Sequence, residues 1–456
     1  MPAAPENGCL PVVDPVPRII PRSEHAISRK NIDREALKVL YRLRDAGHTA
    51  YLVGGGVRDL YLGKTPKDFD ISTDARPGQL RKIFRNSRLI GRRFRLVQVF
   101  FPGGKIIEVS TFRRRNEYDE AGNGDSREAV LAADNTFGNP AEDAFRRDLT
   151  INALFYEIEN FSIIDYTGGV DDLNRGIIRM IGDPDRRFAR DPVRMLRVIR
   201  HAARNNFMVE EKTWLAMARH CQELTLCPVS RIRDEFFRDL HGSASQPWAR
   251  LAMDSGIFVV LLPFYKKYLL DDAADTTRVR LLANLGIIDR IHGQGALLPD
   301  HLLLALLLLP WAKAELNLAA APQKGPQAHQ FSRLLRARID EILVPLNISR
   351  AVKEVVALLL ANLPLFEQED RKGSEGGWPK WLKKKSYFKD CERFYRLLHE
   401  VDRSPQPLAP IDPELVNEIT RPASRKSAKR RPSHRGSRGP AFASNSGGGI
   451  FGLKKR

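Results

Sequence analysis

Apolar and polar positions follow one pattern in the first part of the chain and another in the second. From Tyr51 to about Asp183, short apolar runs alternate with helically spaced residues, which predicts a mixture of strands and helices. From Asp191 to about Glu400, apolar residues recur at helical spacing almost throughout, which predicts an all-helical part. The change of pattern near Gly182 marks the predicted boundary between the two parts.

The apolar runs of the first part predict a small mixed sheet. Strands are expected at Thr49–Val53, Leu89–Ile90, Leu96–Phe101, Lys105–Val109, Leu154–Tyr156 and Ile163–Tyr166. A Pro102-Gly103-Gly104 turn joins two of these strands, and helices are expected at Asn31–Ala46 and from Val57 onward. Residues 116–135 are rich in Gly, Asp, Glu and Asn and predict a mobile loop.

Together these patterns predict an α+β head followed by an all-α neck and body. We expect five segments: an extended leader at 1–30, the head at 31–183, the neck at 184–265, the body at 266–410 and a disordered basic tail at 411–456. Residues 421–456 hold eleven Lys or Arg and no Asp or Glu, among many Ser, Gly and Pro. Such a composition does not bury enough apolar surface to fold alone.

The chain carries a large positive charge, with a formal net charge of +19 and a pI near 9.9. This charge favours a polyanionic partner, and nucleic acid before a membrane surface. A disordered basic tail adds phosphate contacts that do not depend on sequence, so we assign Lys429, Arg430 and Arg431 to RNA contact. The alternative is that the tail only keeps the protein in solution.

The cysteine and apolar patterns predict a cytoplasmic protein without a membrane segment. The four cysteines are scattered and form no Cys-x-x-Cys pair, which argues against a disulfide framework or a structural zinc site. Residues 1–21 are Pro-rich and lack the continuous apolar stretch of a signal peptide. The longest apolar run, Leu302–Pro310, is too short to cross a bilayer.

A pair of carboxylates, Asp68 and Asp70, follows a glycine-rich turn at Gly54-Gly55-Gly56. Residues two apart on a strand point to the same face, so the carboxylates are expected to project together while Phe69 enters the core. A divalent cation relieves their repulsion, and the turn leaves backbone N–H groups free for phosphate. Taken singly, the turn also fits a plain tight turn, and the pair fits a solvated strand end. Their order and spacing favour a nucleotide-using enzyme.

Two further places carry candidate phosphate or metal chemistry. In Arg146-Arg147-Asp148, two arginines beside an acid suit triphosphate binding, because Arg forms bidentate bonds to phosphate; a surface salt-bridge cluster is the alternative. Glu108 lies among apolar neighbours on a predicted strand and therefore requires a partner. That partner is either the Asp68/Asp70 site or one of Arg113 and Arg114.

The stretch Asp191–Arg204 predicts one amphipathic helix, with Asp191 as its N-cap and Pro192 in its first turn. Its apolar face comprises Met195, Leu196, Ile199, Ala202 and Ala203, and its basic face comprises Arg194, Arg197, His201 and Arg204. One interpretation is a capped helix with a solvated basic face. In the other, Asp191 and Arg194 hydrogen-bond a nucleobase edge while the rest of the basic face, with Arg197 and Arg204, follows RNA.

These motifs resemble those of the class II nucleotidyltransferases of the polymerase β superfamily, a family that contains CCA-adding enzymes and bacterial poly(A) polymerases. The resemblance is dense from about Ile20 to Phe207. It rests on Leu52–Asp59 followed by Asp68-Phe69-Asp70, on Arg146–Ala153 and on Asp191-Pro192-Val193-Arg194. One departure is Arg190, which stands where the family usually has Glu and alters the charge beside the predicted base-reading residues.

Two segments, Ile20–Lys30 and Leu89–Val99, resemble bacterial poly(A) polymerases in particular, and Pro228–Glu235 resembles the family's neck-to-body segment. The resemblance implies transfer of AMP from ATP to the 3′ ends of RNA, including mRNA and small or decaying RNAs, without a template. The alternatives are CCA addition to tRNA and a catalytically inactive RNA-binding protein. The sequence indicates no protein partner.

The resemblance also implies a role for each matched residue. Two Mg²⁺ ions would be held by Asp68 and Asp70. The other acids of the active site would be Asp148 and, as an additional carboxylate, Glu108. The triphosphate or sugar would be contacted by Gly54, Gly55, Arg58 and Arg147, and the adenine edge would be read by Asp191 and Arg194.

Overall fold

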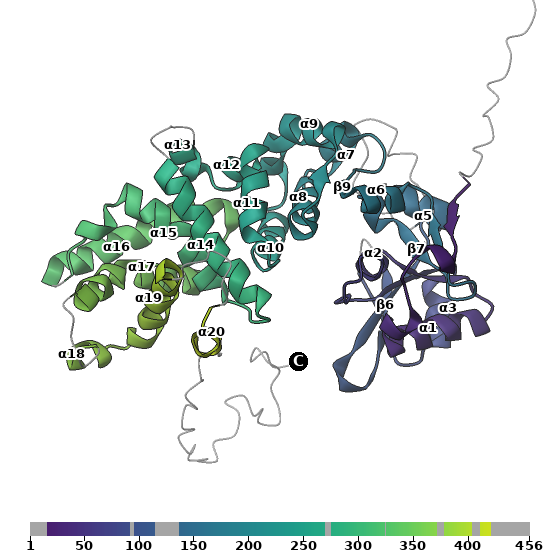
Figure 1. The fold of residues 1–456 in the computed structure, drawn as a ribbon, viewed down its shortest axis with the longest axis horizontal. Helices are drawn as coiled ribbons and strands as arrows, with labels where there is room; N and C mark the ends of the chain where they lie inside the picture. Colours follow the sequence, from purple (N-terminus) through teal and green to yellow (C-terminus); the bar gives the residue numbers. More distant parts are fainter. Residues whose placement is uncertain are drawn as a thin grey trace, which may run out of the picture.

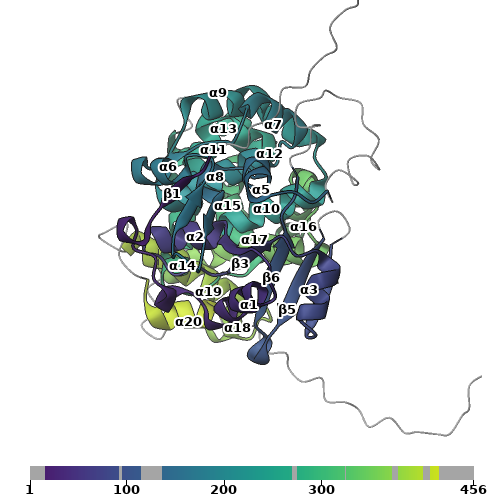
Figure 2. The same ribbon diagram turned by 90° about the vertical axis from the view of Figure 1, so that its right-hand side faces the viewer.

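The computed structural model describes residues 16–91, 95–114, 136–269, 275–323, 325–371, 378–403 and 411–420. A mixed head and a helical body lie at opposite ends of an elongated molecule, with a helical neck between them (Figure 1). Figure 2 views the molecule along its length, with the head nearest the viewer. The predicted loop at 116–135, the start of the leader and the tail with Lys429, Arg430 and Arg431 lie outside the described residues.

Within the described residues, the head is built on one eight-stranded sheet in the order β1-β8-β7-β2-β3-β6-β5-β4. Its strands are β1 (Arg18–Ile20), β2 (Ala50–Val53), β3 (Asp70–Thr73), β4 (Ser87–Ile90), β5 (Leu96–Phe100), β6 (Ile106–Thr111), β7 (Leu154–Tyr156) and β8 (Ile163–Asp165). In this sheet β3 and β6 run parallel, and the other neighbouring strands run antiparallel. The predicted mixed sheet is therefore confirmed.

Part of the predicted leader belongs to the head. β1 pairs antiparallel with β8 at the edge of the sheet, and Ile20 and Ile27 are buried. His25 Nε2 lies 2.8 Å from the backbone oxygen of Phe161, beyond the end of β7. From Arg18 onward the chain is a part of the head rather than a separate leader, because its apolar side chains complete the core beneath the sheet edge.

Five described helices flank the sheet: α1 (Arg34–Asp45), α2 (Gly55–Tyr61), α3 (Pro77–Ile83), α5 (Pro140–Arg146) and α6 (Gly169–Arg175). The side chain of Asp33 caps α1 by accepting from the N–H groups of Glu35 and Ala36, at 2.8 and 3.2 Å. α2 begins directly after β2, so that a single residue, Gly54, makes the turn between them. This short connection brings the glycines to the end of the sheet where β3 begins.

The neck begins with α7 (Pro184–Arg190), α8 (Arg194–Asn205) and α9 (Glu211–His220), and continues with α10 (Val229–Leu240), α11 (Ser245–Asp254) and α12 (Ile257–Leu261). The predicted apolar face of α8 is confirmed, since Met195, Leu196, Ile199, Ala202 and Ala203 are all buried. The prediction that Asp191 is the N-cap of this helix was wrong. α8 begins at Arg194, and the Asp191 side chain instead pairs with Arg231 of α10, so Asp191 closes a turn that precedes the helix.

The body comprises α13 (Lys266–Leu269), α14 (Asp275–Gly293), α15 (Asp300–Glu315), α16 (Gly325–Ile342), α17 (Arg350–Arg371), α18 (Lys380–Lys383), α19 (Phe388–Arg403) and α20 (Pro413–Thr420). The apolar run of α15 is core, because Leu302–Leu309 are at most 4% exposed. Pro310 cannot bond the carbonyl of Leu306, which instead accepts from Asn284 Nδ2 at 2.9 Å. No helix in the described part of the chain combines the length and apolar character that a membrane span requires.

The predicted boundary of the tail at 411 is corrected by α20. Ile411, Leu415, Val416 and Ile419 are buried, and α20 contacts α19. These apolar residues at helical spacing extend the folded body to residue 420.

Candidate nucleotide-binding and catalytic site

The turn between β2 and α2 requires glycine for two reasons. Gly54 has φ +72° and ψ −138°, a conformation that other residues adopt only at a cost. A Cβ on Gly54 would also lie 3.2 Å from Arg147 Nη1, and one on Gly56 would lie 3.3 Å from the backbone oxygen of Asp68. The turn therefore packs directly between the predicted phosphate-binding arginine and the predicted metal ligands.

Replacing Gly54 with alanine is expected to raise the KM for a nucleoside triphosphate about tenfold. The cost is backbone strain of about 1–3 kcal/mol together with displacement of Arg147 from the turn. Gly63→Ala is the matched control, because Gly63 also has a positive φ, +69°, but a Cβ there would meet nothing within 4 Å. Steady-state kinetics on both variants test the prediction, and equal effects would show that the contact with Arg147 is unimportant.

The carboxylates Asp70 and Glu108 lie side by side at the middle of the sheet. β3 and β6 are parallel with Asp70 opposite Glu108, so both side chains leave the same face. Gln98 of β5, in register with Glu108, donates from Nε2 to Glu108 Oε1 at 3.0 Å. The structure thus places Glu108 beside the predicted metal pair, which was one of its two predicted surroundings.

Asp68 and Asp70 do not both lie on a strand as expected. β3 begins at Asp70, and Asp68 precedes it on an exposed segment whose backbone packs against Gly56. Phe69 packs against the core as predicted. The expected placement of Phe69 in the core is therefore correct, although Asp68 lies outside the strand.

The pKa of Asp70 is raised to about 6. Protein atoms that displace water from one side of the carboxylate are the main cause, and the charges of Glu108 and Asp68 add to it against the opposing charge of Arg147. Hard oxygen ligands whose charges repel one another suit a divalent cation. Among the residues that the structure describes, no group of three or more His, Cys, Asp or Glu side chains is arranged to hold a metal, and the assignment of Asp68 and Asp70 as metal ligands stays a prediction.

Arg147 crosses from α5 to the glycine turn. Its Nη2 donates to Asp143 Oδ2 at 2.9 Å and to Ser72 Oγ at 3.4 Å, and its Nη1 donates to the backbone oxygen of Asn152 at 3.3 Å. The guanidinium also lies over the ring of Phe155, 5.5 Å from the centroid. These contacts hold the positively charged guanidinium of Arg147 between the glycine turn and the carboxylates.

Most N–H groups of the Arg58 guanidinium contact other side chains. Its Nε and Nη2 donate to Asp59 Oδ1 at 2.9 and 2.7 Å, and its Nη1 donates to Asn152 Oδ1 at 2.6 Å and lies 3.2 Å from His201 Nδ1. Asp59 and Asn152 take three of the five N–H groups of this guanidinium, the second N–H of Nη1 faces His201, and none of these contacts uses the second N–H of Nη2. That nitrogen lies nearest to the Cβ position of Gly55, at 3.4 Å, so the remaining donor is at the turn.

Asp148 pairs with an arginine of the neck. It is buried, its Oδ1 accepts from the N–H of Leu149 at 2.9 Å, and its Oδ2 lies 2.7 Å from Arg197 Nε of α8. Burial alone would raise its pKa, but the charges of the arginines of α8, first of all Arg197 and also Arg194, hold the pKa of Asp148 well below its usual range. The acid predicted to act with Asp68 and Asp70 therefore lies at the junction of head and neck.

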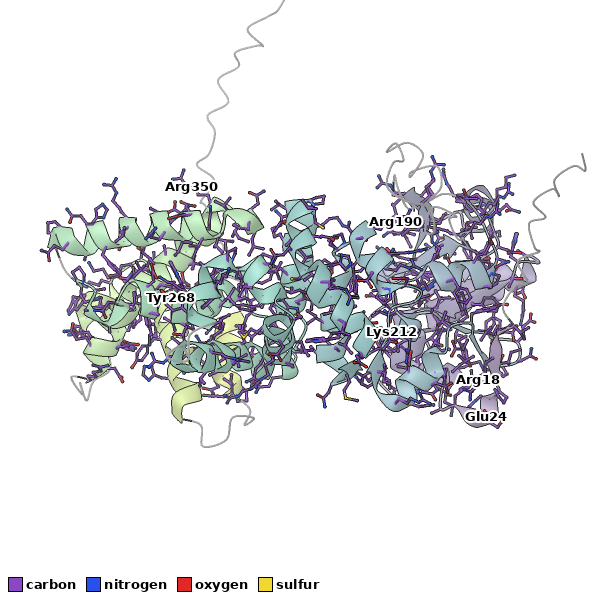
Figure 3. All side chains as sticks on the ribbon, turned by 90° about the horizontal axis from the view of Figure 1, so that it is seen from above. Arg18, Glu24, Arg190, Lys212, Tyr268 and Arg350 are labelled. Atoms are coloured by element: carbon purple, nitrogen blue, oxygen red, sulfur yellow. The ribbon has the colours of Figure 1, made fainter. Side chains whose placement is uncertain are left out.

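Contacts within the neck hold Asp191 and Arg194, the two residues predicted to read the base. Asp191 Oδ2 lies 3.7 Å from Arg194 Nε, and Asp191 Oδ1 lies 3.1 Å from Arg231 Nη1. Arg231 was not predicted, because it comes from α10, forty residues farther along the chain, and nothing local links it to Asp191. Arg190 ends α7 as an exposed residue at the top of the junction between head and neck (Figure 3).

The two arginines of α8 assigned to RNA differ in their surroundings. Arg197 pairs with Asp148 while its side chain is 46% exposed, so contact of Arg197 with RNA stays a prediction. Arg204 is exposed, and its Nη2 donates to the backbone oxygen of Arg238 at 3.2 Å. Contact of Arg204 with RNA stays a prediction.

Comparison with known proteins gives two family matches and close relatives. Residues 50–179 match the family described as "Poly A polymerase head domain", and residues 206–269 match "Probable RNA and SrmB-binding site of polymerase A". The poly(A) polymerase I of Escherichia coli O6:H1 is 38% identical over 359 residues, which are 76% of this chain and 76% of that protein. The poly(A) polymerase I of Salmonella typhi is 45% identical over 305 residues.

The match to the Salmonella protein covers 66% of this chain and 65% of that protein, so the chain spans just under two thirds of that relative. Among solved structures, the CCA-adding enzyme of Bacillus stearothermophilus in complex with CTP has a TM-score of 0.59 at 23% identity, and the match covers 82% of this chain and 79% of that one. At this identity the likeness concerns the fold, and it agrees with a mixed head followed by helical domains.

Proposed function

Because the chain belongs to the poly(A) polymerase family, we propose that it adds AMP units from ATP to the 3′-hydroxyl of RNA without a nucleic-acid template, releasing pyrophosphate. The observation that carries the proposal is the relation to a poly(A) polymerase I at 38% identity over 76% of both chains. The substrates are the 3′ ends of mRNA and of small or decaying RNAs in the cytoplasm.

Asp68 and Asp70 hold two Mg²⁺ ions in this proposal, and Glu108 supports the same site. When bound, the ions lower the pKa of the RNA 3′-hydroxyl and neutralise the triphosphate and the leaving pyrophosphate. The protein groups supply the remaining positioning. The backbone of the Gly54–Gly55 turn and the guanidinium of Arg147 bind phosphate, and Arg58, whose Nη2 lies 3.4 Å from the Cβ position of Gly55, contacts the same phosphate.

The opposite end of the nucleotide is bound by the neck. Arg194 and Asp191 offer a donor and an acceptor to the adenine edge, and the ion pair with Arg231 orients the Asp191 carboxylate. Asp148, held ionised by Arg197, is a further acid of the active site in this proposal. Arg204 and the basic tail with Lys429, Arg430 and Arg431 contact RNA phosphates.

A gel assay of the purified protein with Mg²⁺ and two RNAs tests the proposal. One RNA is an unstructured oligonucleotide and the other is a tRNA lacking its 3′ CCA, each offered ATP, CTP, GTP and UTP singly and then ATP with CTP. A long ladder on both RNAs with ATP alone is the expected result. A stop after three additions, on the tRNA only and requiring CTP, would make the protein a CCA-adding enzyme, and RNA binding without any Mg²⁺-dependent turnover would make it an inactive RNA-binding protein.

A further inference from the structure

A histidine of the neck, His201, contacts residues at the phosphate end of the site. It lies on α8 one turn beyond Arg197 and is partly buried. Its Nδ1 lies 3.2 Å from Arg58 Nη1, and its Nε2 lies 3.3 Å from Asn152 Nδ2. None of the roles proposed above uses this side chain.

The surroundings of His201 keep its ring neutral. Guanidinium and amide nitrogens only donate, and a neutral imidazole has one acceptor nitrogen, so the ring accepts from either Arg58 or Asn152. Loss of water around the ring, and then the charge of Arg58, hold the pKa of His201 well below its usual range, against the opposing charge of Asp148. A neutral acceptor can approach the cationic Arg58 without repulsion.

Asn152 connects this histidine to both arginines proposed to bind the triphosphate. Its Oδ1 accepts from Arg58 at 2.6 Å, and its backbone oxygen accepts from Arg147 at 3.3 Å. Asp59 holds the other edge of the Arg58 guanidinium. The orientation of Arg58 therefore depends on an acid from its own helix and on the Asn152–His201 contact.

We propose that His201 is a positioning residue through which α8 orients Arg58 at the triphosphate end of the site. The same helix begins with Arg194 at the proposed base end and holds Asp148 through Arg197. One rigid element thus contacts both ends of the nucleotide, so a base that fits the neck also aligns the triphosphate in the head. This inference rests on the proposed function, because it takes the roles of Arg58 and Arg194 from it.

The variant His201→Phe keeps a ring of similar size and removes both nitrogens. We expect its KM for ATP to rise about tenfold, as for the loss of one hydrogen bond to a charged group, with the KM for RNA unchanged. We also expect the ratio of kcat/KM for ATP to that for CTP to fall, because the base-reading helix no longer aligns the triphosphate. Steady-state kinetics on an unstructured oligonucleotide measure both quantities.

Two conservative variants separate a positioning role from packing. His201→Asn keeps an oxygen acceptor near the Nδ1 position, facing Arg58, and His201→Gln keeps one near the Nε2 position, facing Asn152. Recovery of the KM for ATP to within about threefold of wild type by one of them supports the inference and identifies the bonded partner. The matched control is Lys64→Ala, which removes a different contact between head and neck, the hydrogen bond from Lys64 Nζ to Asn205 Oδ1 at 2.9 Å, and should leave the kinetics unchanged.

Either of two results would overturn the inference. One is a folded His201→Phe variant with a wild-type KM for ATP and a wild-type ATP/CTP ratio. The other is a loss that neither His201→Asn nor His201→Gln restores, which would mean that the ring acts by packing alone. If the wild-type protein binds ATP but adds no AMP, the proposed function fails, and equilibrium ATP affinities of the same variants then decide the role of His201.

Discussion

Replacing Asp70 with alanine is expected to lower AMP incorporation by about a thousandfold or more while changing RNA affinity by less than about twofold. Asp70 opens β3 beside Glu108, where the sheet places two carboxylates on one face. A metal ion contributes several kcal/mol to the stabilisation of transition-state charge, and each 1.36 kcal/mol is tenfold in rate, so loss of a ligand removes about that factor. The gel assay measures incorporation, and fluorescence anisotropy with a labelled oligonucleotide measures RNA binding.

The control for this variant is Asp74→Ala, just beyond the other end of β3. Asp74 is a carboxylate of the same segment, but it pairs with His48 at 3.0 Å, so its removal should leave incorporation unchanged. A second readout does not depend on turnover. Added Mg²⁺ should raise the thermal unfolding midpoint of the wild type and not that of Asp70→Ala, because a ligand stabilises only the protein that binds it. Retained incorporation, or an equal Mg²⁺ effect in both proteins, would contradict the assignment of Asp70 as a metal ligand.

The elements of the head and body that depend on local pattern were predictable. Leu302–Leu309 are core because a continuous apolar run has no polar face to present to water, and the strands at Leu96–Phe100 and Ile106–Thr111 follow from apolar runs around a turn. Errors occurred where a distant partner decided the outcome. Arg18–Ile20 is a strand because β8 lies beside it, and Asp191 does not cap α8 because Arg231 attracts its carboxylate.

The residues of the candidate site also divide into those that local sequence predicts and those whose contacts a distant partner decides. The glycine turn and the Asp68/Asp70 pair are local in sequence, so spacing alone was sufficient to place them together. The pairing of Arg197 with Asp148 joins residues 49 positions apart, and the contact of Arg58 with His201 spans 143 positions. A basic helix face in the sequence is equally compatible with RNA, solvent or an acid of another domain, and packing of the neck against the head decides among them.

The neck that carries these contacts is itself held together by a buried charge cluster. Arg200 of α8 contacts two acids of α10: its Nε lies 2.5 Å from Asp239 Oδ1, and its Nη2 pairs with Glu235. The side chains are 9%, 0% and 14% exposed for Arg200, Asp239 and Glu235. Glu235 also pairs with the exposed Arg238, at 2.8 Å, so Asp239 is the acid whose ion pair depends on Arg200. Burial raises the pKa of Asp239 to about 7 even though the charge of Arg200 opposes the rise.

Replacing Arg200 with methionine is expected to lower the free energy of unfolding by about 3–5 kcal/mol at pH 7.5, because it leaves the buried carboxylate of Asp239 without its ion-pair partner, whereas Glu235 keeps Arg238. Arg219→Met is the matched control. Arg219 makes an equally short ion pair, 2.7 Å from Asp185, but the two side chains are 56% and 45% exposed, so its loss should cost less than about 1 kcal/mol. Urea unfolding of the three proteins measures the difference.

The pH dependence of this effect follows from the raised pKa of Asp239. The unfolded pKa is about 4 and the folded one about 7, so between these values the native state binds more protons than the unfolded state. The contribution of Asp239 to stability therefore falls as the pH rises through this window. Removing Arg200 raises the folded pKa of Asp239 further, which extends the loss above pH 7. The destabilisation by Arg200→Met should thus be larger at pH 8 than at pH 5.5, where Asp239 accepts a proton.

Neutralising the acids provides the decisive comparison. In Arg200→Met combined with Asp239→Asn and Glu235→Gln, no buried charge remains, so most of the lost stability should return and the difference between pH 5.5 and pH 8 should disappear. A pH-independent loss that persists in the triple variant would mean that Arg200 stabilises the neck by packing of its stem, and not by its charge. Because His201 follows Arg200 directly on α8, recovery of ATP affinity together with stability in the triple variant would also show that the head depends on the position of this helix.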